Sequence, residues 1–339
     1  MNKNEQEYFG KTGERMKVKK LWRLTKKTLI AGVAIVIVLL GVGFEYQWIG
    51  AKNDLAKLKP PGERYDVFGH KMHIYTGGEG KVTVVFNAGW GTVNPYVDYY
   101  PLYDRIEDHA RFAVIDRFGY GYSDQTERKR DIDNIVVEMH ELLKKSEVKP
   151  PYILVGHSLS SLETIRFVQK YPDEVKGIVL LDGGSPEYYS KQTPLTGVSL
   201  FQRFLVMSGV ARVMYHFKGF AESIANERNG MKLLPHELKE IDRVSTLLKA
   251  NNKNITDEMR QSKLNARKVL KGKNPLEVPM TVITSGRFGK QQSEWIDSQA
   301  KLTSWSNMGK QVIVEEAEHY IHQYQPDLVA KEILNMVKE

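Results

Sequence analysis

Short apolar runs that alternate with helical stretches are the feature of this 339-residue chain that most limits its fold. Several of the runs end in Gly, Asn or Asp. Continuous apolar runs are typical of strands covered on both faces, as in a parallel sheet flanked by helices. We therefore predict an α/β fold with an open, mostly parallel sheet, whose strands lie at residues 72–75, 82–86, 112–115, 152–155, 178–181, 280–284 and 312–314.

An apolar segment at residues 28–49 precedes this body. No charge interrupts residues 29–44, and Thr28, Tyr46 and Trp48 extend the segment to the roughly 20 residues that a bilayer requires. We predict an uncleaved signal-anchor that forms one transmembrane helix. Lys and Arg gather before it, so the positive-inside rule predicts a basic cytoplasmic segment at residues 1–27 and an extracytoplasmic body. A cleaved signal peptide of a secreted protein, or a buried helix of a soluble fold, are the other interpretations.

The charge of the chain argues against a nucleic-acid partner. Of the formal net charge of +8, residues 1–27 carry +6, from nine Lys/Arg and three Glu, which leaves +2 for the remainder. Nucleic-acid binding requires a basic face on the folded domain. The sequence contains no Cys, which excludes a thiol nucleophile and a thiolate metal site.

The body divides into a core and an insertion. Residues 50–64 read as a linker and residues 65–339 as the folded domain. Between residues 186 and 279 the strand rhythm stops, and apolar residues such as Phe201, Phe204 and Phe217 recur at helical intervals. We predict a helical lid over the active site there; a packed helical extension fits the same pattern.

Ser158 is the candidate nucleophile. It lies in Gly156-His157-Ser158, between the predicted strand at residues 152–155 and a helical pattern that ends at Pro172. A sharp turn between strand and helix exposes a serine hydroxyl above the sheet. Three other serines also follow a glycine two residues earlier, but none combines a buried-type strand before it with a helical pattern after it: Ser123, Ser185 and Ser199.

His319 is the candidate base, because it directly follows the last predicted strand. A serine nucleophile needs a base that takes its proton, and a late histidine loop returns over such a turn when the order along the chain is Ser, acid, His. His322 is the reserve candidate. For the oxyanion, the glycine-rich turn after the strand at residues 82–86 brings the backbone amide of Trp90 beside that of Leu159.

These motifs together resemble the α/β-hydrolase superfamily, in its serine-nucleophile esterase and lipase branch. The resemblance covers residues 60 to 339. Residues 116–123, Asp-Arg-Phe-Gly-Tyr-Gly-Tyr-Ser, are similar to a loop of that family, and His319 with Pro326 resembles its C-terminal ending. The resemblance implies that Asp116 and Arg117 are structural residues below the site.

The sequence departs from the family at two points. Ser160 stands where the turn usually has its final Gly, and the segment after Thr284 lacks the expected acid. Asp182, at the end of the strand at residues 178–181, is the first candidate for the triad acid, because the superfamily also supplies its acid from that strand. Asp297 is the alternative acid, and Glu294 or no acid remains open.

We therefore expect a membrane-anchored serine hydrolase that cleaves a carboxylic ester, with a small-molecule or lipid-like acyl substrate and an acyl-enzyme intermediate. No metal or organic cofactor is expected. Peptidase, amidase or thioesterase chemistry on the same triad is the alternative, and a noncatalytic receptor or interaction protein with this fold is the alternative from another class. Epoxide hydrolysis is disfavoured, because those relatives use a carboxylate nucleophile.

Overall fold

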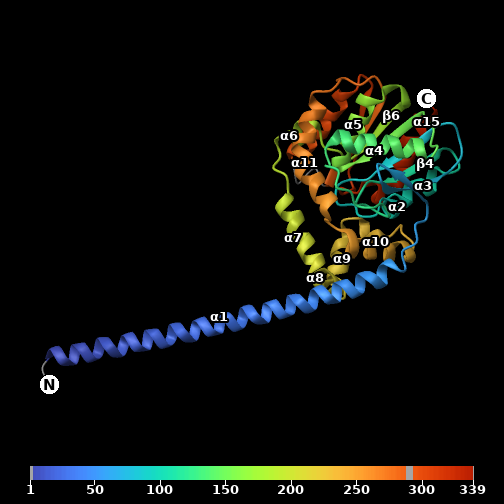
Figure 1. The fold of residues 1–339 in the computed structure, drawn as a ribbon. Coiled ribbons are helices and arrows are strands. Elements are labelled where there is room, and N and C mark those ends of the chain that lie inside the picture. Colours follow the sequence, from blue (N-terminus) through green and yellow to red (C-terminus); the bar gives the residue numbers. More distant parts are fainter. Residues whose placement is uncertain (1–2, 288–292, 339) are drawn as a thin grey trace.

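A computed structural model describes residues 3–287 and 293–338. The described residues form one eight-stranded sheet in the order β1-β2-β4-β3-β5-β6-β7-β8 (Figure 1). Strand β2 is antiparallel to β1 and β4, and all other neighbours are parallel, so the prediction of a mostly parallel α/β sheet is confirmed. The strands are β1 Glu63–Val67, β2 His70–Gly77, β3 Thr83–Asn87, β4 Arg111–Asp116, β5 Tyr152–His157, β6 Val175–Leu181, β7 Met280–Ser285 and β8 Gly309–Val314.

Helices cover both faces of the sheet (Figure 1). Along β5, Tyr152 and Leu154 enter one apolar core while Ile153 and Val155 enter the other, because alternate side chains of a strand point to opposite faces. The first core is completed by α4 (Ile132–Lys145) and α5 (Ser161–Lys170), and the second by α3 (Tyr100–Ile106), α14 (Ile321–Tyr324) and α15 (Pro326–Lys338). A short helix, α2 (Pro95–Asp98), precedes α3.

The strand register brings the functional loops together. Asn87 at the end of β3 pairs with Gly156 of β5, and His157 at the end of β5 pairs with Leu181 of β6. In open α/β sheets, ligands bind at the carboxyl ends of the strands. The loops after β3, β5 and β6 therefore meet at one edge of the sheet.

The chain between β6 and β7 is helical, as the apolar periodicity predicts. Its helices are α6 (Pro186–Lys191), α7 (Thr196–Met207), α8 (Val210–Met214), α9 (Lys218–Asn226), α10 (His236–Lys249) and α11 (Lys253–Leu270). After β7 comes α13 (Ser293–Leu302).

A single helix, α1 (Lys3–Leu55), precedes the sheet and extends away from it (Figure 1). Its part from Leu21 to Leu55 is long and apolar enough to cross a membrane, and none of its apolar window is buried in the protein. The bounds of the predicted linker are wrong at both ends, since residues 50–55 are helical and β1 starts at Glu63. Asp54, in the last turn of this helix, pairs with Arg212 of α8 at 2.7 Å. Strand β1 is not among the predicted strands, because this edge strand carries charged residues and does not form an apolar run.

Candidate active site

Ser158 lies in a strained turn between β5 and α5. Its φ is +54°, in the left-handed region, and a 3₁₀ turn over Ser158–Ser160 leads into the helix. The turn also requires β5 and α5 to approach closely. Gly156 permits this approach, because a Cβ there would collide with the hydroxyl of Thr164. Backbone strain of this kind is typical of functional sites, and here it lifts the Ser158 side chain above the sheet.

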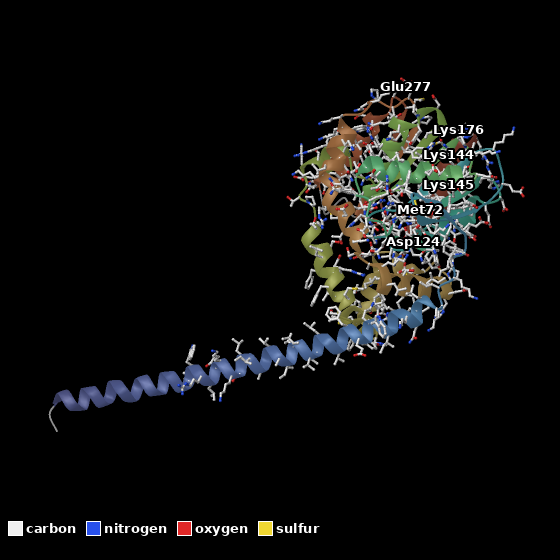
Figure 2. All side chains as sticks on the ribbon, in the orientation of Figure 1. Met72, Asp124, Lys144, Lys145, Lys176 and Glu277 are labelled. Carbon is white, nitrogen blue, oxygen red and sulfur yellow. The ribbon has the colours of Figure 1, made fainter. Side chains whose placement is uncertain are left out.

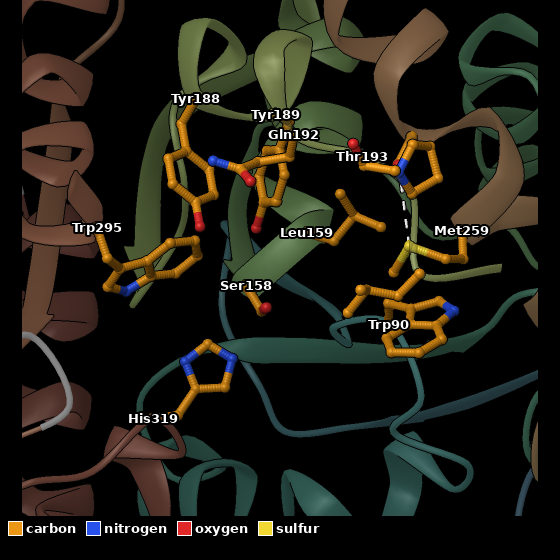
Figure 3. Close-up of a pocket in the computed structure, with 13 residues that line it drawn as sticks. Trp90, Ser158, Leu159, Tyr188, Tyr189, Gln192, Thr193, Met259, Trp295 and His319 are labelled. Carbon is orange, nitrogen blue, oxygen red and sulfur yellow. Dashed lines mark hydrogen bonds between the residues drawn. The ribbon is translucent and has the colours of Figure 1, made fainter. Parts of the chain in front are cut away.

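His319 follows β8 and faces Ser158 across a shared pocket (Figure 3). Its Nδ1 lies 2.6 Å from Oδ2 of Asp182. A carboxylate only accepts hydrogen bonds, so a neutral His319 donates from Nδ1 and keeps a lone pair on Nε2. The ring is 24% exposed, which leaves it open to the pocket.

Asp182 is fully buried at the end of β6, and its φ is +42°. Three further groups donate to its carboxylate: the backbone amide of Ser285 at 3.0 Å, Nε1 of Trp295 at 3.2 Å, and Nε2 of Gln299. A buried anion needs such donors, and together they fix its orientation toward His319.

The structure does not bring the alternative acids to the histidine. Asp297 and Glu294 lie on α13 with exposed side chains. The loop after β7, where the family commonly carries its acid, is described as far as Arg287, and residues 288–292 lie outside the described residues. Among the predicted acids within the described chain, Asp182 is the one in contact with His319.

Two other histidines pack beside His319 in structural roles. His157 donates from Nε2 to the carbonyl oxygen of His319 at 3.0 Å, and burial, followed by the neighbouring His319 and His322, lowers its pKa well below the usual range. His322, the reserve base, is fully buried and lies 2.8 Å from Asp98. It is therefore turned away from the pocket that Ser158 lines.

The loop after β3 lies directly against the nucleophile. A Cβ placed on Gly89 would come within 3.0 Å of Cβ of Ser158, so this approach needs a glycine. The backbone amide of Trp90 forms no hydrogen bond within the described residues, and the Leu159 amide lies in the first helical turn, where amides lack intrahelical acceptors.

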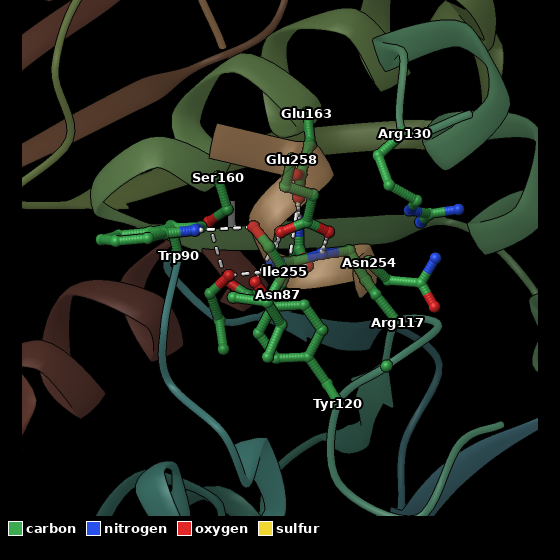
Figure 4. Close-up of polar contacts among 12 residues, drawn as sticks. Asn87, Trp90, Arg117, Tyr120, Arg130, Ser160, Glu163, Asn254, Ile255 and Glu258 are labelled. Carbon is green, nitrogen blue, oxygen red and sulfur yellow. Dashed lines mark hydrogen bonds and ion pairs between the residues drawn. The ribbon is translucent and has the colours of Figure 1, made fainter. Parts of the chain in front are cut away.

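A buried charge network supports this loop from below (Figure 4). Arg117 donates to Asn87 at 2.5 Å and to the Ala88 carbonyl at 2.7 Å, and it pairs with Glu163 at 3.3 Å and Glu258 at 3.0 Å. Burial, together with Glu258, raises the pKa of Glu163 to about 7, although Arg117 opposes the rise. The network joins α5 and α11 to the loop that carries Trp90.

Ser160, a departure from the family pattern, has a defined position. Its hydroxyl donates to the Asn87 carbonyl at 2.8 Å, with the His157 carbonyl at the same distance. A glycine has no such donor. The serine therefore ties the turn at Ser158 to the loop after β3.

The pocket over Ser158 has a volume of about 260 Å³ and a mainly apolar lining. Residues from the insertion form one wall, and Trp90, which donates from Nε1 to the Ile255 carbonyl at 2.9 Å, forms another (Figure 3). Burial raises the pKa of Tyr189, and hydrogen bonding to Ser158 opposes the rise. Within residues 3–287 and 293–338, no group of three His, Asp or Glu side chains converges to hold a metal ion.

Sequence reasoning missed the residues that surround the predicted ones. Tyr189 beside Ser158, and Trp295 and Gln299 beside Asp182, lie on α6 and α13, outside any recognisable motif. Their one signal in the sequence is position: they follow the strands β6 and β7, whose carboxyl ends border the site.

Comparisons with known proteins agree with this architecture. The family model described as "alpha/beta hydrolase fold" matches residues 82–210. The chain is 31% identical over 319 residues to YbdG, an uncharacterized protein of Bacillus subtilis (strain 168), across 93% of this chain and 97% of YbdG.

Two solved structures are similar in fold. The enol-lactonase of Burkholderia xenovorans LB400 has 16% identity and a TM-score of 0.61, covering 82% of this chain and all of that chain. An epoxide hydrolase of Bacillus megaterium has 15% identity and a TM-score of 0.62, with the same coverage. The chain belongs to the α/β-hydrolase family.

Proposed function

We propose that this protein is a membrane-anchored serine hydrolase that cleaves a carboxylic ester through an acyl-enzyme. The observation that carries the proposal is the contact of 2.6 Å between His319 Nδ1 and Asp182 Oδ2, with Ser158 in a strained turn of the same pocket. Strain at the nucleophile and a buried, oriented carboxylate behind the base are what acyl transfer by a serine requires.

In this mechanism, the Oγ of Ser158 attacks the carbonyl carbon of the substrate while Nε2 of His319 takes the hydroxyl proton. The carbonyl oxygen becomes an oxyanion that accepts hydrogen bonds from the backbone amides of Trp90 and Leu159. The carbon–oxygen bond to the leaving alcohol then breaks, and His319 returns the proton to that oxygen. Water repeats the sequence on the acyl-enzyme, releases the acid and restores Ser158.

Asp182 holds His319 in the tautomer that leaves Nε2 basic, and it stabilises the imidazolium formed during each proton transfer. Its donors from Ser285, Trp295 and Gln299 support this role, because they orient the carboxylate without competing for the proton of His319. The contact also weighs against a noncatalytic protein, for which the missing acid after Thr284 is the main sequence argument.

The apolar lining and the volume of about 260 Å³ support a substrate with a modest apolar acyl group. One of the structural neighbours is named an enol-lactonase, a protein that acts on a cyclic ester. Amides and thioesters react through the same steps, so a substrate panel must separate them. We also propose that residues 186–279 act as a lid, since Leu195 and Met259 line the pocket.

For the N-terminus we propose a single transmembrane span over residues 28–49, with residues 1–27 in the cytoplasm and the body outside. The exposed apolar stretch of α1 and the basic residues before it support this topology. Membrane fractionation with N-terminal sequencing tests it. A mature N-terminus near residue 44 or beyond would replace the anchor by a cleaved signal peptide and a secreted enzyme.

Covalent labelling tests the catalytic proposal. Full-length protein in detergent is incubated with a fluorophosphonate probe, beside Ser158→Ala, His319→Ala and the exposed-site control Asp297→Asn. We expect labelling of the wild type and of the control, and none of the first two variants. Failure of the folded wild type to react at Ser158 refutes the proposal. Esters of increasing chain length, thioesters and peptide amides then identify the substrate class.

A further inference from the structure

Helices α7 and α8 present an unusual surface to the outside of the protein. Along both helices and the turn that follows α8, large apolar side chains are exposed, up to 61% for Phe201 and Phe217. We define this surface as the apolar lid face; it consists of Leu195, Val198, Leu200, Phe201, Phe204, Met207, Val210, Val213, Met214 and Phe217. Monomeric soluble proteins rarely expose contiguous apolar patches of this kind.

The opposite side of these helices faces the protein and carries polar side chains beside the buried Val206. Ser199 is fully buried and hydrogen bonded to Asn251, and Arg203 donates to the carbonyl groups of Leu248 and Ala250. A surface helix of a soluble domain has the reverse arrangement, with its apolar stripe on the core. The apolar lid face therefore matches an apolar environment outside the protein.

Helix α1 fixes where this surface lies. A Cβ at Gly43 would collide with the Ser208 carbonyl, and one at Gly209 would collide with the Gly43 carbonyl, so the turn between α7 and α8 packs on α1 backbone to backbone. Polar contacts lock the junction: Tyr46 with His216 at 3.0 Å, and Arg212 with Asp54 at 2.7 Å. The apolar lid face is thus held at a set height along α1.

That height corresponds to the edge of the bilayer. Gly43 lies within the uninterrupted apolar run of α1, six residues before Ile49, the end of the proposed span. At a rise of about 1.5 Å per residue, the turn at Ser208 lies about 9 Å inside that end. Interfacial amphipathic helices bury their apolar face to a depth of about 5–10 Å.

The picture of the whole molecule agrees with this placement. Helix α7 runs across the direction of α1 on the side of the body from which the N-terminal part of α1 extends (Figure 1). In the same orientation, some side chains of α7 project from its outer side, away from the sheet (Figure 2). A bilayer around the apolar part of α1 reaches this side of the body first.

The pocket over Ser158 opens toward the same surface. Residues 192–195 line the pocket and lead directly into α7, and Leu195 both lines the pocket and is 54% exposed on the apolar lid face. Leu195 therefore joins the lining of the Ser158 pocket to the apolar lid face.

We propose that α7 and α8 lie in the membrane interface, with the apolar lid face against the acyl chains, so that the Ser158 pocket takes an apolar acyl substrate directly from the bilayer. The first part rests on α1 spanning the membrane, and the second on the proposed hydrolase activity. The partner is the lipid bilayer itself, since the surface is continuous with the transmembrane helix.

The absence of Cys from the sequence allows a direct test by spin labelling. Phe201→Cys and Val213→Cys are each labelled in full-length protein reconstituted in phosphatidylcholine vesicles. Collision rates with oxygen, which enriches in the bilayer, and with a water-soluble nickel chelate give the depth of each label. Ile35→Cys in the span is the membrane control. Ile313→Cys, 55% exposed on β8 at the far edge of the sheet from β1, is the aqueous control.

We expect labels at Phe201 and Val213 to resemble the label at Ile35, with high oxygen and low nickel collision rates. If they resemble the label at Ile313 while Ile35 is in lipid, the interfacial placement is wrong and the anchor stands. If the label at Ile35 is also in water, the span is refuted and the placement with it. None of these readings depends on enzymatic activity.

Turnover tests the route of the substrate. The double variant Phe201→Gln and Phe204→Gln is compared with Ile313→Gln on a long-chain ester embedded in vesicles and on a short soluble ester. We expect at least about a tenfold loss on the embedded ester, because burying one phenylalanine changes a partition constant by more than a factor of ten. The soluble ester should be cleaved unchanged. Equal effects on both esters overturn the proposed route, and labelling of Ser158 independently reports the chemistry.

Discussion

The substitution Asp182→Asn is the sharpest test of the proposed triad, because it changes charge and hydrogen bonding with almost no change in shape. Within the described residues, four groups contact the carboxylate and each donates to it: His319, Ser285, Trp295 and Gln299. Asparagine replaces one of the two carboxylate oxygens by an NH₂ group, which is itself a hydrogen-bond donor. Whichever way the amide turns, it faces groups that previously donated.

The geometry decides which orientation is preferred. On the Oδ1 side the NH₂ would face the backbone amide of Ser285, which cannot turn, at 3.0 Å. On the Oδ2 side it would face the longer 3.2 Å contact of Trp295 Nε1 and the His319 ring, which can move its proton from one nitrogen to the other. We therefore expect the NH₂ to face His319 and donate to Nδ1. The proton of the ring then lies on Nε2, which can no longer accept the proton of Ser158.

Loss of the correct tautomer in a serine triad lowers kcat by about 10⁴, equivalent to about 5 kcal/mol of transition-state stabilisation. The fold should survive, because disturbing one buried hydrogen-bonding group costs about 1–3 kcal/mol. The assay measures kcat/KM on the best ester of the panel and the melting temperature in detergent, with Asp297→Asn as the matched control. If folded Asp182→Asn keeps more than about a tenth of the activity, the assignment of the acid and the tautomer argument are both refuted.

Three further substitutions test the surroundings of the site. Burial raises the pKa of Glu163 from 4.5 to about 7, so the folded state holds this proton more tightly than the unfolded chain, and the free energy of unfolding falls as pH rises between these values. The variant Glu163→Gln should therefore remove about 3 kcal/mol of the difference in stability between pH 4 and pH 8, measured by thermal melts. An unchanged pH dependence contradicts this. Ser160→Gly, which restores the usual family residue, removes the donor to Asn87 and should lower stability by about 1–2 kcal/mol; equal or higher melting temperature argues against the role of the hydroxyl. Arg212→Met leaves Asp54 buried without its partner and should cost about 3 kcal/mol, with recovery when Asp54→Leu is added; no recovery means the ion pair does not hold α1 to the body.

Much of the fold follows from local sequence, because buried parallel strands are continuous apolar runs. The turn at Ser158 is predictable for the same reason: strand, glycine and helix are adjacent in the chain. The contact between Asp182 and His319 cannot be predicted from local sequence in this way. It depends on where β6 and β8 end relative to each other, and on Ser285 and Gln299, which donate from other elements. A single sequence offers several acids and no way to bring one of them to the histidine.

The apolar pattern of the insertion shows a second limit. Phe201, Phe204 and Phe217 recur at helical spacing, which predicts helices with one apolar side. Periodicity does not say what covers that side, and the same pattern fits a packed extension. The structure buries Val206 together with the polar residues Ser199 and Arg212, and leaves most of the large apolar side chains exposed.

The contacts of α11 divide the insertion into two parts with different freedom to change. Helix α11 contributes Glu258 to the ion pair with Arg117, the Ile255 carbonyl to Trp90, and Asn254 to the backbone at Thr126. It therefore belongs to the machinery that shapes the oxyanion loop, although it lies within the inserted segment. Within residues 196–250, Ser245 accepts a hydrogen bond from Asn94, farther along the same loop from Trp90, at 2.9 Å. Exchange of that stretch between relatives is the natural route to a new substrate range, whereas an exchange that extends past Asn251 takes the supports of the catalytic loop with it.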